Sequence, residues 1–406
     1  MAGATGSQQP ATCPGNHSKG GVVGSLRYVW LMSRIPINSA VLQWALSDAD
    51  VSLPDAARLT GRSLEEVEKW VSVDGQNPHK GDLEKLAKRL GRSLQFFFLP
   101  EPPSSAPSTV RFRSAIEGES ADPAAEHRAV RQAAGAQKVA RWAAVFHTSA
   151  PVSLPVPAGH PVDFAGQMRD FLGWSLQEQV NATSKSAAFK QLRARVEQLG
   201  VVVIYLSAGE RNCRGFSLPD ELAPVVALNS AFNLASLKSF TLLHELGHLA
   251  KGTAAICHEP ESEEERWCDE FASAFLLPEA HLRGYFAYKG WSSVTVRQID
   301  DRIRLTSNRY NASWQAVAIR LRQLDLASQE VVDAVFANSH EVSTGFSPDG
   351  GRTRPLIRLD EFGTTFTRAV IGLRSSNQLS EFDARQQLNV NRSEFEQLKM
   401  LMSGAA

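Results

Sequence analysis

The sequence of 406 residues lacks the features that would place it in a membrane or outside the cell. No apolar run approaches the roughly 20 residues that span a bilayer. The N-terminus has no signal-peptide apolar region. The four cysteines, Cys13, Cys213, Cys257 and Cys268, show no disulfide-framework spacing and suit a reducing compartment. These absences predict a cytoplasmic protein with no membrane partner.

The chain also lacks an excess of charge of either sign, because 43 lysines and arginines balance 43 aspartates and glutamates. A balanced chain creates no global field that would recruit nucleic acid or membrane. Hydrophobic residues make up 43% of the sequence, which is ample for soluble cores. A chain of this length is expected to form two or three domains, so function has to be sought in local motifs.

The most informative motif is His-Glu-x-x-His at residues 244–248, inside a leucine-rich segment. Residues four apart lie one turn apart on the same face of a helix, so His244 and His248 can hold one Zn²⁺. Glu245 is then placed to act as a general base. The surrounding leucines predict a buried helix, and buried histidines need partners. Gly247 costs helix stability, which indicates either close packing or room for a substrate.

A second helix is expected over residues 263–278, with an apolar face that includes Cys268. Glu265 is the predicted third zinc ligand, and Glu264 is the alternative. Asp269 follows Glu265 by one turn and would orient a ligand histidine from behind. The helix dipole also favours acidic residues in a first turn. The dipole does not explain why the acidic pair of Glu265 and Asp269 reaches the apolar face of the helix.

Together these motifs resemble the ImmA/IrrE family of metallopeptidases. The resemblance rests on residues Phe240 to His248 and Glu265 to Pro278. Pro224–Asn229 also resembles the family's strand before the zinc helix. The resemblance covers roughly residues 110 to 325 and implies a compact zincin-like core that makes limited cuts in a repressor or similar regulatory protein. Alanine is usual where Cys268 stands, and cysteine is small and apolar enough to pack there.

The mechanism expected from such a site needs three ligands and one base. Zn²⁺ held by His244, His248 and Glu265 would keep a fourth position for water and lower the pKa of that water. Glu245 would take the proton and later deliver it to the leaving amine.

The substrate is expected to lie as an extended strand beside four residues, Val225, Val226, Ala227 and Leu228, by β-augmentation. His258, Tyr285 and Tyr310 are candidates for stabilising the oxyanion, although each can equally be structural or exposed. Cys257 and His258 form either an exposed loop pair or a reversible blocking ligand for the metal.

Residues 35–101 carry a helix-turn-helix pattern. If Leu53 is position 1, the small, turn-forming and core positions fall on Ala57, Gly61, Val67 and Trp70. The pattern resembles the XRE (Cro/repressor-like) class, a common N-terminal partner of this peptidase family.

The expected recognition helix, residues 63–70, carries three glutamates that would repel phosphates. Arg58, Arg62 and Lys69 are the candidate contacts to DNA or to a partner protein. Binding to DNA and docking onto the helix-turn-helix of a substrate repressor are both open on this sequence.

The predicted fold class is multidomain and mainly α, with an α+β core that holds a small sheet. The expected order is a disordered tail (1–34), the helix-turn-helix domain (35–101), a linker (102–110), the zincin-like core (111–290), a helical helix-turn-helix-like end of the peptidase unit (291–338), a linker (339–355) and a small helical tail (356–406). Met32 is expected to be the natural start rather than Met1.

Two functions compete. The first is a zinc-dependent endopeptidase that cuts a helix-turn-helix repressor and relieves repression, in a stress response, mobile-element control or toxin–antitoxin control. The second is a DNA-binding transcriptional regulator whose protease-like domain only docks partners or senses a signal. The intact set of His244, Glu245, His248 and Glu265 favours the first, because a scaffold does not need a general base.

Overall fold

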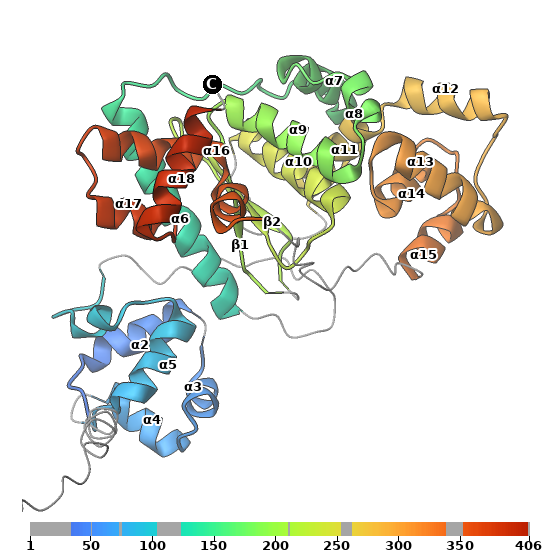
Figure 1. Ribbon diagram of the computed structural model, residues 1–406. Coiled ribbons are helices and arrows are strands. Elements are labelled where there is room, and N and C mark those ends of the chain that lie inside the picture. Colours follow the sequence, from blue (N-terminus) through green and yellow to red (C-terminus); the bar gives the residue numbers. More distant parts are fainter. Residues whose placement is uncertain are drawn as a thin grey trace, which may run out of the picture. The chain divides into compact units, whose positions relative to one another are not determined.

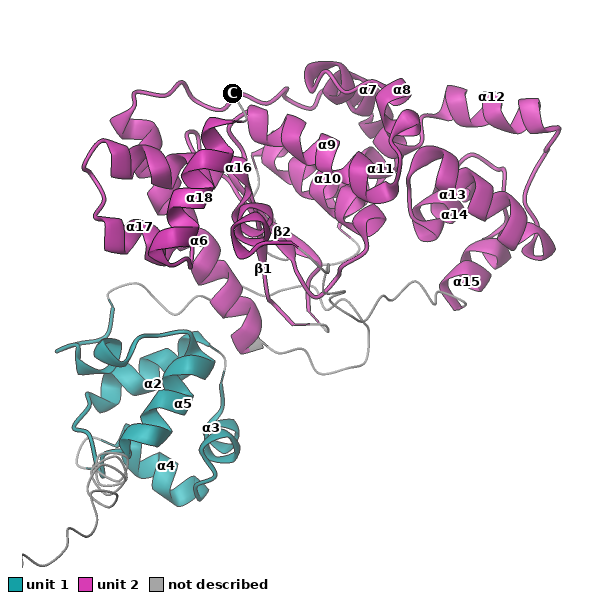
Figure 2. Ribbon diagram, in the orientation of Figure 1, with its two compact units in different colours: residues 1–107 teal, residues 108–406 magenta. Residues whose placement is uncertain are grey.

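The computed structural model describes residues 34–49, 51–72, 75–103, 123–209, 212–252, 262–337 and 352–404. The chain divides into two compact units, residues 1–107 and 108–406 (Figure 2). The expectations for the N-terminal tail with Met1 and Met32, for most of both linkers, and for Cys257 and His258 lie outside the described residues. None of the described helices is long and apolar enough to cross a bilayer.

The described part of the first unit is helical. It comprises α2 (Ser39–Asp48), α3 (Leu53–Thr60), α4 (Leu64–Val71), α5 (Lys80–Leu90) and the 3₁₀ turn η1 (Leu94–Phe98) (Figure 1). Gly61 ends α3 with φ of 73°, and Ser63 starts α4 with a reciprocal capping box to Glu66. Val67 and Trp70 are buried in the core of the unit. The assignment to a DNA-binding class stays a prediction.

The second unit combines many helices with one small sheet, as predicted. It opens with α6 (Pro123–Phe146), α7 (Pro161–Phe171), α8 (Leu176–Asn181) and α9 (Lys185–Gln198). The centre holds β1 (Val202–Leu206), β2 (Gly215–Leu218), β3 (Val225–Asn229), α10 (Ala235–Lys251) and α11 (Glu263–Leu276). The helices that follow are α12 (Glu279–Lys289), η2 (Val296–Gln298), η3 (Ile299–Ile303), α13 (Arg304–Tyr310), α14 (Trp314–Gln323), α15 (Gln329–Ala337), α16 (Arg354–Ser375), α17 (Glu381–Gln387) and α18 (Arg392–Ser403).

The described strands form one sheet in the order β1-β3-β2, with β1 parallel and β2 antiparallel to β3. Alternate residues of the strands enter two different cores. Val203 and Val226 pack with α9, α10 and α11, whereas Val202 and Val225 pack with α6 and α16. A sheet that is covered on both faces favours apolar residues on both sides of its strands, which explains the apolar run Val225–Leu228 in β3.

The C-terminal helices form one of these two layers. Phe366 and Val370 of α16, Ala384 of α17 and Phe395 of α18 are buried in the same core as strand residue Ile204. The segment expected as a small helical tail thus packs against the sheet within the second unit.

A buried ion pair on α9 anchors α16 where that helix is broken. Gly363 interrupts α16 with φ of 72° and ψ of 170°. The Glu197 carboxylate accepts hydrogen bonds from the backbone N–H of Thr364, at 3.2 Å, and from its hydroxyl, at 2.7 Å. Arg193 pairs with Glu197 at 3.2 Å and donates to the carbonyl oxygen of Asp360 at 2.6 Å. Because α16 is broken here, its backbone groups can form hydrogen bonds with the buried charges of Arg193 and Glu197 on α9.

We expect Gly363→Ala to lower the free energy of unfolding by about 3 kcal/mol or more. A Cβ atom at this position would overlap the Glu197 carboxylate and lie 2.6 Å from the carbonyl oxygen of Val203, and the positive φ adds strain. Gly135→Ala is the matched control. It lies in α6 with nothing within 4 Å of the added Cβ, so it should raise stability by about 0.5–1 kcal/mol. Urea denaturation followed by circular dichroism measures both. Equal stability of the two variants would contradict this account.

Candidate metal centre

Helix α10 holds the two histidines of the motif against the core. Leu242, Leu243 and Leu246 are fully buried on its apolar side. At Gly247 an added Cβ would lie 3.1 Å from Cδ1 of Phe271 and 3.2 Å from Sγ of Cys268, both on α11. Of the two explanations offered for this glycine, the geometry supports close packing of α10 on α11.

This packing brings three metal-binding side chains together. The Nε2 atoms of His244 and His248 are 3.2 Å apart. The Glu265 carboxylate lies 3.2 Å from Nε2 of His244 and 3.4 Å from Nε2 of His248. Ligand atoms about 2.1 Å from a tetrahedral ion lie roughly 3.4 Å from each other. Two imidazole nitrogens and one carboxylate at these separations therefore fit a single metal ion of the zinc type.

Two further carboxylates orient the histidines from behind. Oδ1 of Asp269 lies 2.8 Å from Nδ1 of His244, and Oε1 of Glu264 lies 3.1 Å from Nδ1 of His248. Each carboxylate holds a proton on Nδ1 and leaves Nε2 free to face the other donors. Asp269 thus takes its expected position. Glu264, the alternative ligand, instead contacts the far side of His248, a position that its sequence neighbourhood did not reveal.

The three donors perturb one another's pKa values strongly. Burial opposes the charged form of His244, but hydrogen bonds to Asp269 and Glu265 outweigh it and raise its pKa to about 10. The pKa of His248 is raised by Glu265 and Glu245, again against burial. The pKa of Glu265 falls well below its usual range despite burial, because both histidines donate to it. A cation that binds these donors must displace the shared proton.

Glu245 lies beside the donors, on the buried side of α10. Its side chain is enclosed, and its Oε2 atom has no hydrogen-bond partner among the described residues. Burial raises the pKa of this carboxyl, although His244 and His248 pull it down. The hydroxyl of Ser217, on β2, also lowers that pKa, although its oxygen has no hydrogen-bond partner among the described residues. Sequence reasoning missed Ser217, since a lone serine in a short strand carries no recognisable pattern.

The expectation of a substrate strand beside Val225–Leu228 is wrong. These residues form most of β3, which is the central strand and pairs with β1 on one side and β2 on the other. No edge of β3 is open to another strand. The sequence could not show this, because strand order depends on contacts between distant segments.

The remaining candidates lie elsewhere. Tyr285 and Tyr310 line a different pocket, and the hydroxyl of Tyr310 donates to the carbonyl oxygen of His281 at 3.0 Å. That bond gives Tyr310 a structural role.

The candidate DNA contacts in the first unit are already paired. Arg58 pairs with Asp55 one turn before it. Nε of Arg62 lies 2.9 Å from Asp82, and Nζ of Lys69 lies 2.7 Å from Glu65. These acidic partners neutralise the positive charge that phosphate contacts would need.

Comparison with known proteins supports a peptidase-like assignment of the central region. Residues 196–322 match the family model of a peptidase family described as the IrrE N-terminal-like domain. The matched segment contains the described sheet, α10 and α11, and so all three side chains of the candidate metal centre. No curated protein and no protein of solved structure shows significant similarity to the chain. The family match and the His/His/Glu cluster together suggest a metallopeptidase-like unit at residues 196–322.

We expect the purified protein to hold about one metal ion per chain after incubation with zinc and dialysis. Glu265→Gln and His244→Ala should lose it, because each leaves only two good donors. Glu263→Gln is the matched control, since Glu263 is an exposed neighbour on the same turn. Mass spectrometry of the metal content tests the four proteins. Retention of the ion by Glu265→Gln, or none in the wild type, would overturn the assignment.

Proposed function

We propose that this protein is a zinc-dependent endopeptidase that makes limited cuts in a regulatory protein of the helix-turn-helix repressor type. The observation that carries the proposal is the cluster of two imidazoles and one carboxylate, with the enclosed Glu245 next to it. The regulatory target comes from the resemblance to the ImmA/IrrE family, and the match at residues 196–322 agrees with that family.

His244, His248 and Glu265 would hold Zn²⁺, which supplies a Lewis acid that polarises the scissile carbonyl and activates water. Glu245 takes the proton from the attacking water and later delivers it to the leaving amine nitrogen. The raised pKa of Glu245 suits both steps, because a group whose pKa lies closer to neutrality can both accept a proton and release it. Asp269 and Glu264 keep the imidazoles in the tautomer that presents Nε2.

The outer edge of β2 is the place where a substrate strand fits this arrangement. The backbone N–H of Asn229 donates to the carbonyl oxygen of Arg214, which sets the alternation of the antiparallel ladder. In that alternation, the N–H and C=O groups of Gly215 and Ser217 face away from β3. Gly215 is half-buried whereas Ser217 is fully buried, so an extended peptide would pair at the Gly215 end of this edge.

We expect Glu245→Gln to keep its metal ion but to lose cleavage by a factor of about 10²–10⁴, because the amide cannot accept the proton. The wild type and the variant are expressed in the same host, and new protein N-termini are labelled and identified by mass spectrometry. New termini should appear with the wild type and with Glu263→Gln, but not with Glu245→Gln. The same new termini in all three strains would refute the role of Glu245.

The first unit is proposed to dock a protein partner, such as the helix-turn-helix of the substrate, rather than DNA. Its candidate cationic contacts are neutralised by neighbouring acids. Leu59 and Leu64 are exposed beside them, at 37% and 42%. A surface whose candidate cations are paired with acids and which exposes leucines suits a protein partner better than a phosphate backbone. A DNA-binding regulator is the alternative.

We therefore expect the full chain to bind duplex DNA only weakly, in the range of about 10⁻⁴–10⁻⁶ M that is usual for non-specific binding. Fluorescence anisotropy with pooled random duplexes at physiological salt measures this. If the pool contains a sequence that binds more than about a thousandfold tighter, and if Glu265→Gln leaves that binding unchanged, the regulator alternative replaces the docking role.

A further inference from the structure

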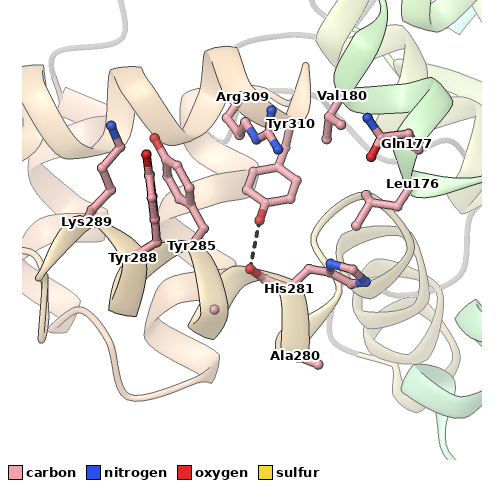
Figure 3. Close-up of a pocket in the computed structure, with 11 residues that line it drawn as sticks. Leu176, Gln177, Val180, Ala280, His281, Tyr285, Tyr288, Lys289, Arg309 and Tyr310 are labelled. Carbon is pink, nitrogen blue, oxygen red and sulfur yellow. Dashed lines mark hydrogen bonds between the residues drawn. The ribbon is translucent and has the colours of Figure 1, made fainter.

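A cavity of about 800 Å³ lies between α8, α12 and α13 (Figure 3). Its lining includes Gln177, Tyr285, Lys289 and Arg309 and none of the side chains of the metal centre. This volume falls within the range of small-molecule sites. The cavity is therefore a separate feature that the proposed peptidase chemistry does not use.

The charge of the lining favours an anion. Lys289 and Arg309 are cationic, and none of the eleven lining residues is acidic. Arg309 is exposed, and it makes no hydrogen bond or ion pair with any described residue, in contrast to the paired arginines of the first unit. A guanidinium with its donors free can bind a carboxylate or a phosphate in a bidentate manner.

The walls are aromatic and already ordered. The rings of Tyr285 and Tyr310 meet edge to face at 6.0 Å, and Tyr285 meets Trp291 in the same way at 5.8 Å. The hydrogen bond from Tyr310 to His281 fixes its ring within the cavity (Figure 3). Burial raises the pKa of the Tyr285 hydroxyl, so this group stays protonated as a donor. Fixed aromatic faces bind a flat ring at little cost in conformational entropy.

The two sides of the cavity are tied together by a buried amide. Nε2 of Gln179, on α8, donates to the carbonyl oxygens of Leu276, at 2.9 Å, and of Tyr310, at 2.7 Å. Nδ2 of Asn311 donates back to the carbonyl oxygen of Gln179 at 2.8 Å. The cavity is therefore preformed, since α8, the end of α11 and the end of α13 are held by hydrogen bonds that a ligand need not make.

We propose that this cavity binds a small molecule in which a negatively charged group stands next to a flat ring. Arg309 receives the anionic group, and the tyrosine rings receive the flat part. An aromatic carboxylate and a mononucleotide share this chemistry, so the experiment has to separate them.

Isothermal titration calorimetry on the full chain uses indole-3-acetate and adenosine monophosphate as probes, with indole-3-acetamide and adenosine as neutral counterparts. We expect saturable binding of at least one anionic probe, and binding of its neutral counterpart to be weaker by about tenfold or more. The probe that binds identifies the source of the charge as a carboxylate or a phosphate.

Arg309→Gln should weaken the anionic probe by about tenfold or more. Arg304→Gln is the matched control, because Arg304 is exposed on the same helix and does not line the cavity. Tyr285→Leu should weaken both the probe and its neutral counterpart. Thermal unfolding and zinc content, unchanged in the variants, show that the fold and the metal centre are intact. No saturable binding of either probe, equal affinity for the neutral counterparts, or equal effects of the two arginine variants would overturn the proposal.

Discussion

The close approach of α10 and α11 is the contact on which the rest of the site depends. Because Gly247 has no side chain, Phe271 and Cys268 pack directly on the backbone of α10. This places Glu265 within hydrogen-bond distance of both imidazoles. A larger residue at 247 would push the helices apart, and a metal site tolerates displacements of only about 0.5 Å. One missing side chain thus links core packing to the geometry of the donors.

The same carboxylates that would help to hold a cation also hold the site together without one. Glu265 shares protons with His244 and His248, and Asp269 and Glu264 bind the opposite nitrogens. A buried cluster of this kind is stable only when its charges are compensated. A proton and a metal ion are alternative ways to do so, which explains why the imidazoles are preoriented in the structure.

The strands of the sheet differ in their position, and the helices that cover its two faces differ in their role. β3 lies in the centre, is buried along its whole length and shares a core with α10, whereas β2 is an outer strand of the described sheet. The layer of α16 to α18 covers the face of the sheet opposite α10. Helices α16 to α18 therefore cover the far face of the sheet on which α10 packs, and the buried pair of Arg193 and Glu197 holds α16 at Gly363.

The sequence by itself determined what helical periodicity controls. The spacing of His244 and His248 and the step from Glu265 to Asp269 depend on one turn of helix, so they could be predicted from neighbouring residues. The tertiary structure alone decided the strand order, the contact of Glu264 with His248, the separate pocket of Tyr285 and Tyr310, and the place of the C-terminal helices. Each of these depends on contacts between residues far apart in the chain, and the periodicity of a segment specifies which face it buries but not against what.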